Sequence, residues 1–534
     1  MTIRDWLDAL LPRSDARSRA VAASVPASPH AVPQEGGPGH SRAAFDAGLA
    51  AYAAHDFATA IDCFKSVLED VHDNADAHNN LGLSYLGLGN GEDAMDSFVL
   101  ALHFRPHFAH ALYNMALAAR ELGNPEQSVA NLERAIELDP GFVAAHSTLG
   151  YVLSHELGEF ERGAAHIRKA LELDPENADV RCNYSAVLTQ EGRAEEALAI
   201  CDDLLAHYPE MHEARLNRSL ALLKSERFAE AWPAYEARKL ARGNYVPRAL
   251  PLPEWQGQGL RNKKLLVYAE QGLGDQIMFA SCLPDLLREA AACVIECAPQ
   301  LVPLFRQSFP AAAIESEALG DAGLTRLAQS AGLDYQAAIG SLPGHFRKST
   351  ADFPRHAGYL KAEPARIDYW RERLRALGPG MKIGISWSGG ALSTGGGSRS
   401  SRLAEWMPIL AQPACNFVSL QYGNAADESK AIAEQSKVAI HEWRDAIDNY
   451  AETAALVSAL DLVISVQTAL VHLTGALGKP AWVMLRQASE WRYLENGETM
   501  PWYPSVRLLR QQRAGDWQPV VARIAQDLAQ LARR

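Results

Sequence analysis

The chain has 534 residues, of which 48% are apolar and 22% charged, so it is long enough for about three or four domains and has the composition of an ordinary soluble protein. Its formal net charge of −13 argues against nucleic acid or an anionic membrane as the main partner. No run reaches the roughly 20 apolar residues that span a bilayer.

The 7 cysteines are scattered, and none forms a CxxC pair or a Cys/His cluster with zinc spacing. This pattern favours buried thiols in a reducing compartment and predicts no metal site. The acidic residues Asp5 and Asp8 interrupt the first apolar stretch, which argues against a secretory signal. Together these features predict a cytoplasmic protein.

Residues 1–42 form a predicted flexible leader, because residues 14–42 are rich in Ala, Ser, Pro and Gly. Apolar residues near its start fit either a short docking helix or a frayed end. They are Trp6, Leu7, Leu10 and Leu11.

A repeat dominates residues 43–245. Small residues, turn glycines and large apolar residues recur in phase, and the fourth unit has one extra residue near its turn. The small residues let two helices approach, the glycine allows a tight turn, and the proline ends the second helix. The pattern resembles about six tetratricopeptide repeats. Its prolines recur at intervals of 34, 35 and 34 residues, at Pro106, Pro140, Pro175 and Pro209.

Such units stack into an α-solenoid with a concave face, because one unit cannot bury its apolar surface alone. We expect that face to hold a protein or peptide acceptor, although a rigid spacer or a dimerisation surface remains an alternative. Asparagine amides on the inner helices could hydrogen-bond an extended backbone, or could simply be solvated. These acceptor-groove candidates are Asn79, Asn80, Asn114 and Asn183.

The second half changes character after a proline-rich linker at residues 246–261. Strands then alternate with helices, which predicts parallel sheets in two doubly wound α/β domains, residues 262–377 and 378–534. A cleft is expected between the carboxyl ends of their strands. The predicted strands are 265–269, 293–297, 334–339, 382–387, 417–421, 461–466 and 481–485.

The first loop expected at the cleft runs over residues 270–276. Gly272 and Gly274 would let backbone amides approach a ligand closely. The loop is neither GxGxxG nor a Walker loop, which argues against a dinucleotide enzyme or a kinase. Asp275 either faces the cleft or is an acidic first-turn residue favoured by the helix dipole.

The second loop begins with Ser388 and Gly389 and continues through a Gly/Ser stretch to Arg399 and Arg402. Glycines, hydroxyls and arginines suit a phosphate or diphosphate, and a surface loop with solvated arginines is the alternative. Gln421, at the end of a predicted strand, either contacts a base or ribose or is an ordinary polar strand end.

The third loop follows a strand that ends at Val466, and a helix is predicted to begin at Gln467 or Thr468. Amides of its first turn, near Ala469, can hold phosphate oxygens, and the Thr468 hydroxyl adds a donor. His472 lies one turn further on the same face and could reach a ribose or phosphate, although a lone helical histidine is more often packed or capping.

Three segments resemble the heptosyltransferase-like glycosyltransferases. They are LVYAEQGLGDQIMFASCLPDL, KIGISWSGG and DLVISVQTALVHLTGALGKPAWVML, which match the family's first βα unit, the first strand of its second domain and its nucleotide-binding unit. Their order and spacing imply the two-domain GT-B architecture. The resemblance places the catalytic base on Asp275 and donor binding on Thr468, Ala469 and His472. The family usually has Asp where this chain has Gln467, so the sugar and base are left open.

The array-plus-transferase layout also resembles O-GlcNAc transferase and the tetratricopeptide flagellin glycosyltransferases. These imply a UDP-linked or a CMP-linked sugar donor, respectively, and a protein acceptor. We therefore expect sugar transfer to Ser or Thr hydroxyls of a protein, possibly flagellin. The nucleotide sugar is a co-substrate, and no cofactor is expected.

In this hypothesis Asp275 takes the acceptor proton, and Thr468 with Arg399 or Arg402 stabilises the leaving phosphate. The expected cleft loops contain no DxD motif, which favours metal-independent transfer. Two segments rich in aromatic residues follow, at 490–493 and 502–504. They either line the sugar site or, as we favour, pack between the domains.

Two other functions remain open. The chain could be a non-catalytic adaptor with a relic transferase domain, for which Gln467 speaks. It could also transfer sugar to a lipid-linked or saccharide acceptor.

Overall fold

The structure is a computed structural model that describes residues 39–241, 248, 250–389, 399–423, 426–436 and 438–533. The leader helix expected near Trp6 and the Gly/Ser stretch before Arg399 lie outside these residues. The chain divides into two compact units, one that ends at Val187 and one that begins at Leu188.

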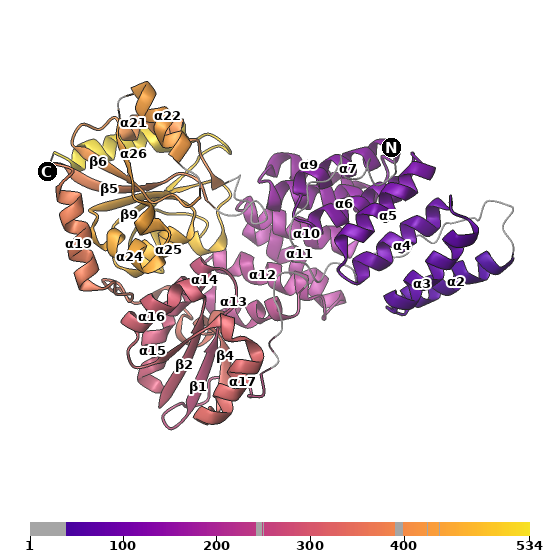
Figure 1. Cartoon of the computed structure of the whole chain (residues 1–534), viewed down its shortest axis with the longest axis horizontal. Helices are drawn as coiled ribbons and strands as arrows, with labels where there is room; N and C mark the ends of the chain where they lie inside the picture. The colour runs from indigo at the N-terminus through magenta and orange to yellow at the C-terminus, as the bar shows by residue number, and fades with distance from the viewer. Residues whose placement is uncertain are drawn as a thin grey trace. The chain divides into compact units, whose positions relative to one another are not determined.

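Residues 39–235 of the described chain form six helix pairs. Figure 1 shows helices of the first pairs lying side by side. The helical repeat predicted from the sequence is confirmed. The pairs are α2 (Gly39–Ala53) with α3 (Phe57–Asp70), α4 (Ala75–Gly87) with α5 (Gly91–Phe104), α6 (Ala109–Glu121) with α7 (Pro125–Leu138), α8 (Val143–Tyr151) with α9 (Phe160–Leu173), α10 (Ala178–Gln190) with α11 (Ala194–His207), and α12 (His212–Lys224) with α13 (Phe228–Tyr235).

The repeated small residues explain how each pair packs. An added Cβ at Gly82 would lie 2.6 Å from Cε1 of Phe98, so only glycine lets α4 approach α5 this closely. The turn glycines adopt left-handed backbone, as at Gly89 and Gly123 with φ of 72° and 75°. The extra residue of the fourth unit coincides with a π-helical turn, η1 (Val152–Glu156), which is how a helix accommodates an insertion.

The first sheet has four parallel strands in the order β3-β2-β1-β4. The strands are β1 (Lys264–Tyr268), β2 (Ala292–Cys297), β3 (Ala313–Ser316) and β4 (Tyr335–Ala338). In Figure 1, α15 (Leu283–Glu289) and α16 (Val302–Ser308) lie on one face and α17 (Gly320–Ala331) on the other. This layering follows from right-handed crossovers in a sheet whose order reverses beside β1.

The second sheet has seven strands in the order β10-β11-β9-β8-β5-β6-β7, with only β10 antiparallel. Without β10, this is the doubly wound order 3-2-1-4-5-6. The strands are β5 (Met381–Ser386), β6 (Cys415–Ser419), β7 (Ile440–Glu442), β8 (Leu462–Val466), β9 (Ala481–Leu485), β10 (Thr499–Met500) and β11 (Tyr503–Arg510). Helices on its two faces include α21 (Met407–Leu410), α22 (Ala426–Ser436), α24 (Tyr450–Ala459), α25 (Ala469–Ala476) and α26 (Gln518–Leu531).

The predicted α/β class of the second half is confirmed. Helix α19 (Pro364–Arg375) precedes the predicted boundary at 377, yet it packs on α24, where Arg366 and Trp370 both bind Glu452 at 2.7 and 2.8 Å. Its side chains therefore stabilise the part of the fold that carries the second sheet.

Each sheet has one point where the strand order reverses, between β1 and β4 and between β5 and β8. Ligands of open α/β sheets bind outside the carboxyl ends of the strands at such points. The loops after β1, β5 and β8 are the three that the sequence singled out, so the topology places all three at the reversal points.

Candidate functional site

The loop after β1 is fixed by a buried ion pair from the sixth helix pair. Arg238, in the 3₁₀ turn η2 (Glu236–Lys239), binds Glu270 at 2.7 Å, and the two side chains are 7% and 4% exposed. Glu270 also accepts the Gly340 N–H at 2.9 Å. Burial tends to lower the pKa of Arg238, but Glu270 and Glu236 outweigh it and raise the pKa above its usual value. The loop is thus held through Glu270 by both the Arg238 side chain and the Gly340 backbone.

Helix α14 (Leu273–Phe279) begins in this loop and packs against α25. An added Cβ at Gly274 would lie 3.0 Å from Cδ2 of His472 and 3.5 Å from Cα of Ala469. Close helix packing therefore accounts for this glycine, where the sequence suggested close approach to a ligand. Gly272 is exposed and has ordinary backbone, with φ of −85°. The contact brings the first and third predicted loops together.

Asp275 lies in the first turn of α14 and forms an ion pair that the sequence did not predict. Its Oδ1 accepts from Nη2 of Arg492 at 2.6 Å, and the two side chains are 18% and 16% exposed. Arg492 also pairs with Glu490, which binds Arg399 at 2.9 Å. The structure thus brings the predicted base and one predicted phosphate-binding arginine to the same cluster.

The charges of this cluster are strongly coupled. Burial alone would raise the pKa of Glu490, but Arg492, Arg399 and Arg486 overcome it and lower the pKa to about 2. Arg486 follows β9 and is 8% exposed, and burial lowers its pKa to about 10. Three guanidiniums, those of Arg399, Arg486 and Arg492, stand against the carboxylates of Glu490 and Asp275, so this net positive cluster is the best candidate for a phosphate contact.

The loop after β5 is held by Gln421. Its Oε1 accepts from the backbone N–H of Trp387 and Ser388 at 3.1 and 3.0 Å, and its Nε2 donates to the Ser388 carbonyl at 2.7 Å. The amide predicted to contact a base or ribose therefore positions the loop in this structure. The Ser388 hydroxyl is 3.1 Å from that of Ser400.

The loop after β8 lies against the loop after β5. A Cβ at Gly389 would clash with Cγ2 of Thr468, so glycine is required by this approach. Thr468 is the N-cap of α25, which begins at Ala469, and its hydroxyl accepts the Leu470 N–H at 3.2 Å. Thr468 and Ala469 are both partly accessible, as phosphate binding at this helix end requires.

Gln467 and His472 are buried beside this helix end. Gln467 is 2% exposed, and neither of its amide atoms has a hydrogen-bond partner within the described chain. His472 hydrogen-bonds the Tyr503 hydroxyl at 3.2 Å through Nδ1. Burial, with a smaller contribution from Arg492, lowers the pKa of His472 to about 3, so the ring is neutral at physiological pH. His472 is 3% exposed and thus reaches a ligand only if the site opens.

Arg402 does not join the cluster. Its side chain is 84% exposed and pairs with Glu405 on its own turn at 3.3 Å. Of the two arginines predicted to hold phosphate, the structure supports Arg399 only, because exposure leaves Arg402 in solvent.

The four asparagines predicted to line an acceptor groove differ in accessibility. Asn79, Asn80 and Asn114 are 0%, 1% and 3% exposed, and Asn114 donates to Asn79 at 2.9 Å. Asn183 is partly exposed and donates to Ser147 at 3.0 Å. Both amide atoms of Asn80 are buried without a partner within the described chain. Their role in holding a polypeptide stays a prediction.

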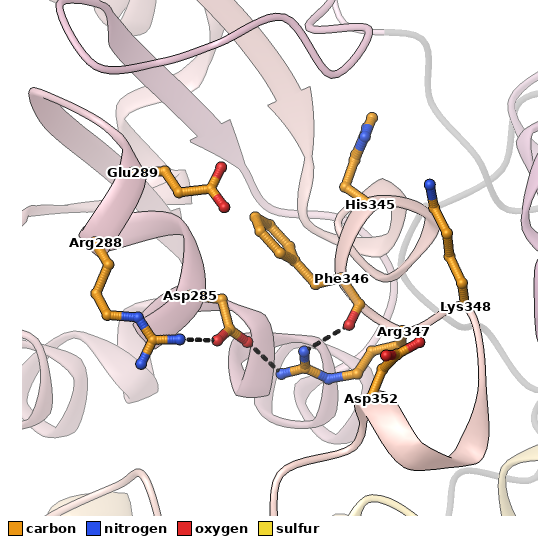
Figure 2. Close-up of a pocket in the computed structure, with 8 residues that line it drawn as sticks. All are labelled: Asp285, Arg288, Glu289, His345, Phe346, Arg347, Lys348 and Asp352. Atoms are coloured by element: carbon orange, nitrogen blue, oxygen red, sulfur yellow. Dashed lines mark hydrogen bonds and ion pairs between the residues drawn. The ribbon is translucent and has the colours of Figure 1, made fainter.

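Two cavities lie away from the predicted loops. One, of about 340 Å³, is lined by the residues drawn in Figure 2, where Asp285 lies between Arg288 and Arg347 and binds Arg347 at 2.7 Å. A second, of about 530 Å³, lies among Gly192, Lys224 and Glu495. Neither contains a predicted site residue, and the charges of the first are largely paired, so the chemistry points to the reversal points instead.

Comparison with known protein families identifies the repeats. Models of the tetratricopeptide repeat match residues 45–107, 109–142 and 154–223. Within the described chain, no helix has the length and apolar character to cross a membrane.

One curated relative matches most of the chain. Protein FlbA of Caulobacter vibrioides is 32% identical over 498 residues, which cover 89% of this chain and 82% of the relative. The chain belongs to the FlbA family. The match extends across both the repeats and the two sheets of this FlbA-family chain.

Two further similarities cover smaller shares of the chain. A peroxisomal targeting signal receptor of Candida albicans is 32% identical over 85 residues, 16% of this chain and 14% of the relative. A thermophilic TPR protein of Thermus thermophilus matches in structure with 23% identity and a TM-score of 0.31, covering 34% of this chain and 99% of that one.

Sequence analysis missed three members of the charged cluster in this FlbA-family chain. Glu490 and Arg492 were assigned to packing, and Arg486 was not considered. The position of Arg486 could have indicated its role, because it directly follows strand β9, whose end lies at the same sheet edge as Thr468. Their pairing with Asp275, more than two hundred residues away, is not visible in any local pattern.

Proposed function

We propose that the two sheets form a GT-B glycosyltransferase, and that it moves a sugar from a nucleotide-sugar donor to Ser or Thr hydroxyls of a polypeptide held by the repeats. One observation carries this proposal. Gly274 of the first sheet's loop packs on Ala469 and His472 of the second sheet's helix, and Gly389 packs on Thr468. Loops predicted separately from three sequence segments thus converge on one place.

The geometry supports a direct displacement. The acceptor oxygen would bond to the anomeric carbon while the bond from that carbon to the leaving phosphate breaks. The hydroxyl proton passes to Asp275, and the electron pair of the broken bond stays on the nucleotide. Arg399, Arg486 and the amides near Thr468 supply positive charge for the leaving phosphate. This cationic set does the work for which other transferases use a metal ion.

The repeats support the choice of a polypeptide acceptor. Tetratricopeptide matches cover three stretches of the array, and such arrays commonly present binding surfaces for other proteins. Asparagines stand on the inner helices of the second, third and fifth helix pairs, and of these the partly exposed Asn183 can offer its amide to an extended backbone. The sugar, the nucleotide (UDP- or CMP-linked) and the acceptor, flagellin among the candidates, are proposals of the same kind.

A second candidate is a non-catalytic adaptor, in which the repeats bind a client and the sheets bind nucleotide or nothing. Two observations favour it. Gln467 stands where the heptosyltransferase-like family usually has Asp, and the predicted base Asp275 already accepts a hydrogen bond from Arg492 at 2.6 Å. The cationic cluster weighs against it, because a relic site has no need to keep three guanidiniums against two carboxylates.

A thermal-shift screen with UDP-, GDP-, ADP- and CMP-sugars tests the proposal. A donor at about 100 times its Kd stabilises the folded chain by about 2.7 kcal/mol, so one donor class should raise the melting temperature. The shift should fall in Arg399→Ala and persist in Arg402→Ala, its exposed neighbour. No shift with any donor would favour the adaptor.

A further inference from the structure

The carboxylate of Asp275 has two oxygens in different surroundings. Its Oδ1 accepts from Arg492 at 2.6 Å. Its Oδ2 has no hydrogen-bond partner within the described chain and lies toward the exposed Gly272, where an added Cβ would be 3.7 Å away. One oxygen is therefore fixed and the other is open to a ligand.

Arg492 is itself held firmly. Its guanidinium binds Asp275 through Nη2 and Glu490 through Nη1, and Glu490 is anchored in turn by Arg399. Burial tends to lower the pKa of Arg492, but Asp275 and Glu490 outweigh it and raise the pKa, so the group is a permanent cation. Its Nε is buried without a partner within the described chain, which leaves one donor directed at no protein group.

Aromatic side chains of α13, in the sixth helix pair, pack against the segment that carries Arg492. Trp491, next to Arg492 in sequence, contacts Trp232 and Tyr235 with ring centroids 6.1 and 6.0 Å apart. Tyr235 also hydrogen-bonds Gln271 in the loop that carries Asp275. Both partners of the ion pair are thus positioned by the same helix, α13.

A simple structural ion pair would need neither an open carboxylate oxygen nor a supporting network. Arg507 shows what such a pair looks like in the same part of the fold, since it binds Glu498 and Asp527 at 2.9 and 2.7 Å on the surface. A base that accepts a proton through one oxygen while the other is held by a neighbour follows the general logic of oriented catalytic groups.

We infer that Arg492 is the positioning residue for Asp275: it holds Oδ1 so that Oδ2 faces the acceptor hydroxyl and takes its proton. This inference rests on the proposed function and deepens it. Arg492 acts through Asp275.

The test compares Arg492→Met, Arg492→Lys and the matched control Arg507→Met in the full chain, with the donor found by thermal shift. We expect Arg492→Met to lower kcat about 100-fold, because a misplaced base loses its attack geometry, with KM changed less than about threefold. Arg492→Lys should recover part of kcat, and Arg507→Met should match the wild type.

The outcomes separate this inference from the proposed function. If Asp275→Asn is inactive but Arg492→Met keeps the wild-type kcat, the positioning role is wrong and the transferase stands. If Arg507→Met loses activity as Arg492→Met does, the effect is general destabilisation, and the positioning role is also wrong. If the wild type turns over no donor, or Asp275→Asn is fully active, the proposed mechanism fails and the inference fails with it.

Discussion

The repeat unit that ends at Val187 and the α/β unit that begins at Leu188 use charge in different ways. In the repeats, ion pairs connect helices at the surface, as between Arg105 and Asp76 of the second helix pair, whose side chains are 41% and 11% exposed. The α/β unit has exposed pairs too, but it also has buried ones, as between Arg238 and Glu270, with 7% and 4%. The repeats therefore depend on a pattern that tolerates local change, and the α/β unit depends on single contacts.

The largest expected effect is the loss of a buried pair. Arg238→Met leaves Glu270 buried without its cation, which destabilises by about 3–5 kcal/mol. Every tryptophan except Trp6 lies at or after residue 232, so tryptophan fluorescence during urea unfolding follows the α/β unit. The urea concentration at the midpoint of unfolding should be clearly lower for Arg238→Met than for the wild type.

The control is Arg105→Met, which removes a half-exposed pair and should change stability by about 1 kcal/mol or less in the helical signal of circular dichroism. Equal losses for the two variants would contradict the contrast between the units. Adding Glu270→Gln to Arg238→Met should restore part of the stability, because the unpaired charge is then gone.

A smaller effect is expected from the two arginines of the loop after β5. Arg399→Ala removes a charged contact in the cluster and should weaken donor binding by roughly 10- to 100-fold, corresponding to about 1.5–3 kcal/mol. Arg402→Ala should stay within about twofold, because its side chain is 84% exposed. Titration of each variant with the donor measures both, and equal losses would show that the buried cluster does not govern binding.

The effect that is smallest at neutral pH, and grows only in acid, is on acid stability. The pKa of His472 falls from 6.5 to about 3 on folding because burial disfavours the cation. The unfolded chain then binds a proton that the folded chain does not, so stability is complete above pH 6.5 and declines as the pH falls toward 3. His472→Gln should flatten this decline in the α/β unit.

Burial also lowers the pKa of His146 in the repeats, so His146→Gln should flatten the acid dependence of that unit only. Hydrogen exchange read by mass spectrometry follows the two units separately. If either variant changed the acid dependence of stability in both units, the two units would unfold together, and their stabilities could not be compared separately.

The sequence was sufficient for the repeats and for the α/β class, because both depend on local periodicity. Among the strands it missed are β3 and β11. Strand β3 is short and lies at a sheet edge, and β11 (Tyr503–Arg510) contains a proline and two arginines and no regular alternation of apolar and polar residues. These strands are defined by their neighbours rather than by their own pattern.

The candidate site was predictable only in part, for a similar reason. Gly274, Gly389 and Thr468 stand in motifs whose spacing carries the signal, and the structure brings them together. The pairing of Asp275 with Arg492 depends on two segments meeting in space, and the clamping of the loop after β5 by Gln421 depends on the register between β5 and β6. Long-range contacts of this kind leave no local trace.

Nucleotide release from the donor, followed in the presence of a polypeptide acceptor, tests the central claim most directly when the wild type is compared with Asp275→Asn. The account predicts acceptor-dependent release by the wild type and a loss of at least about 100-fold in the variant, with the donor-induced thermal shift unchanged. Release at the wild-type rate by Asp275→Asn, or none by the wild type with any donor, would contradict it.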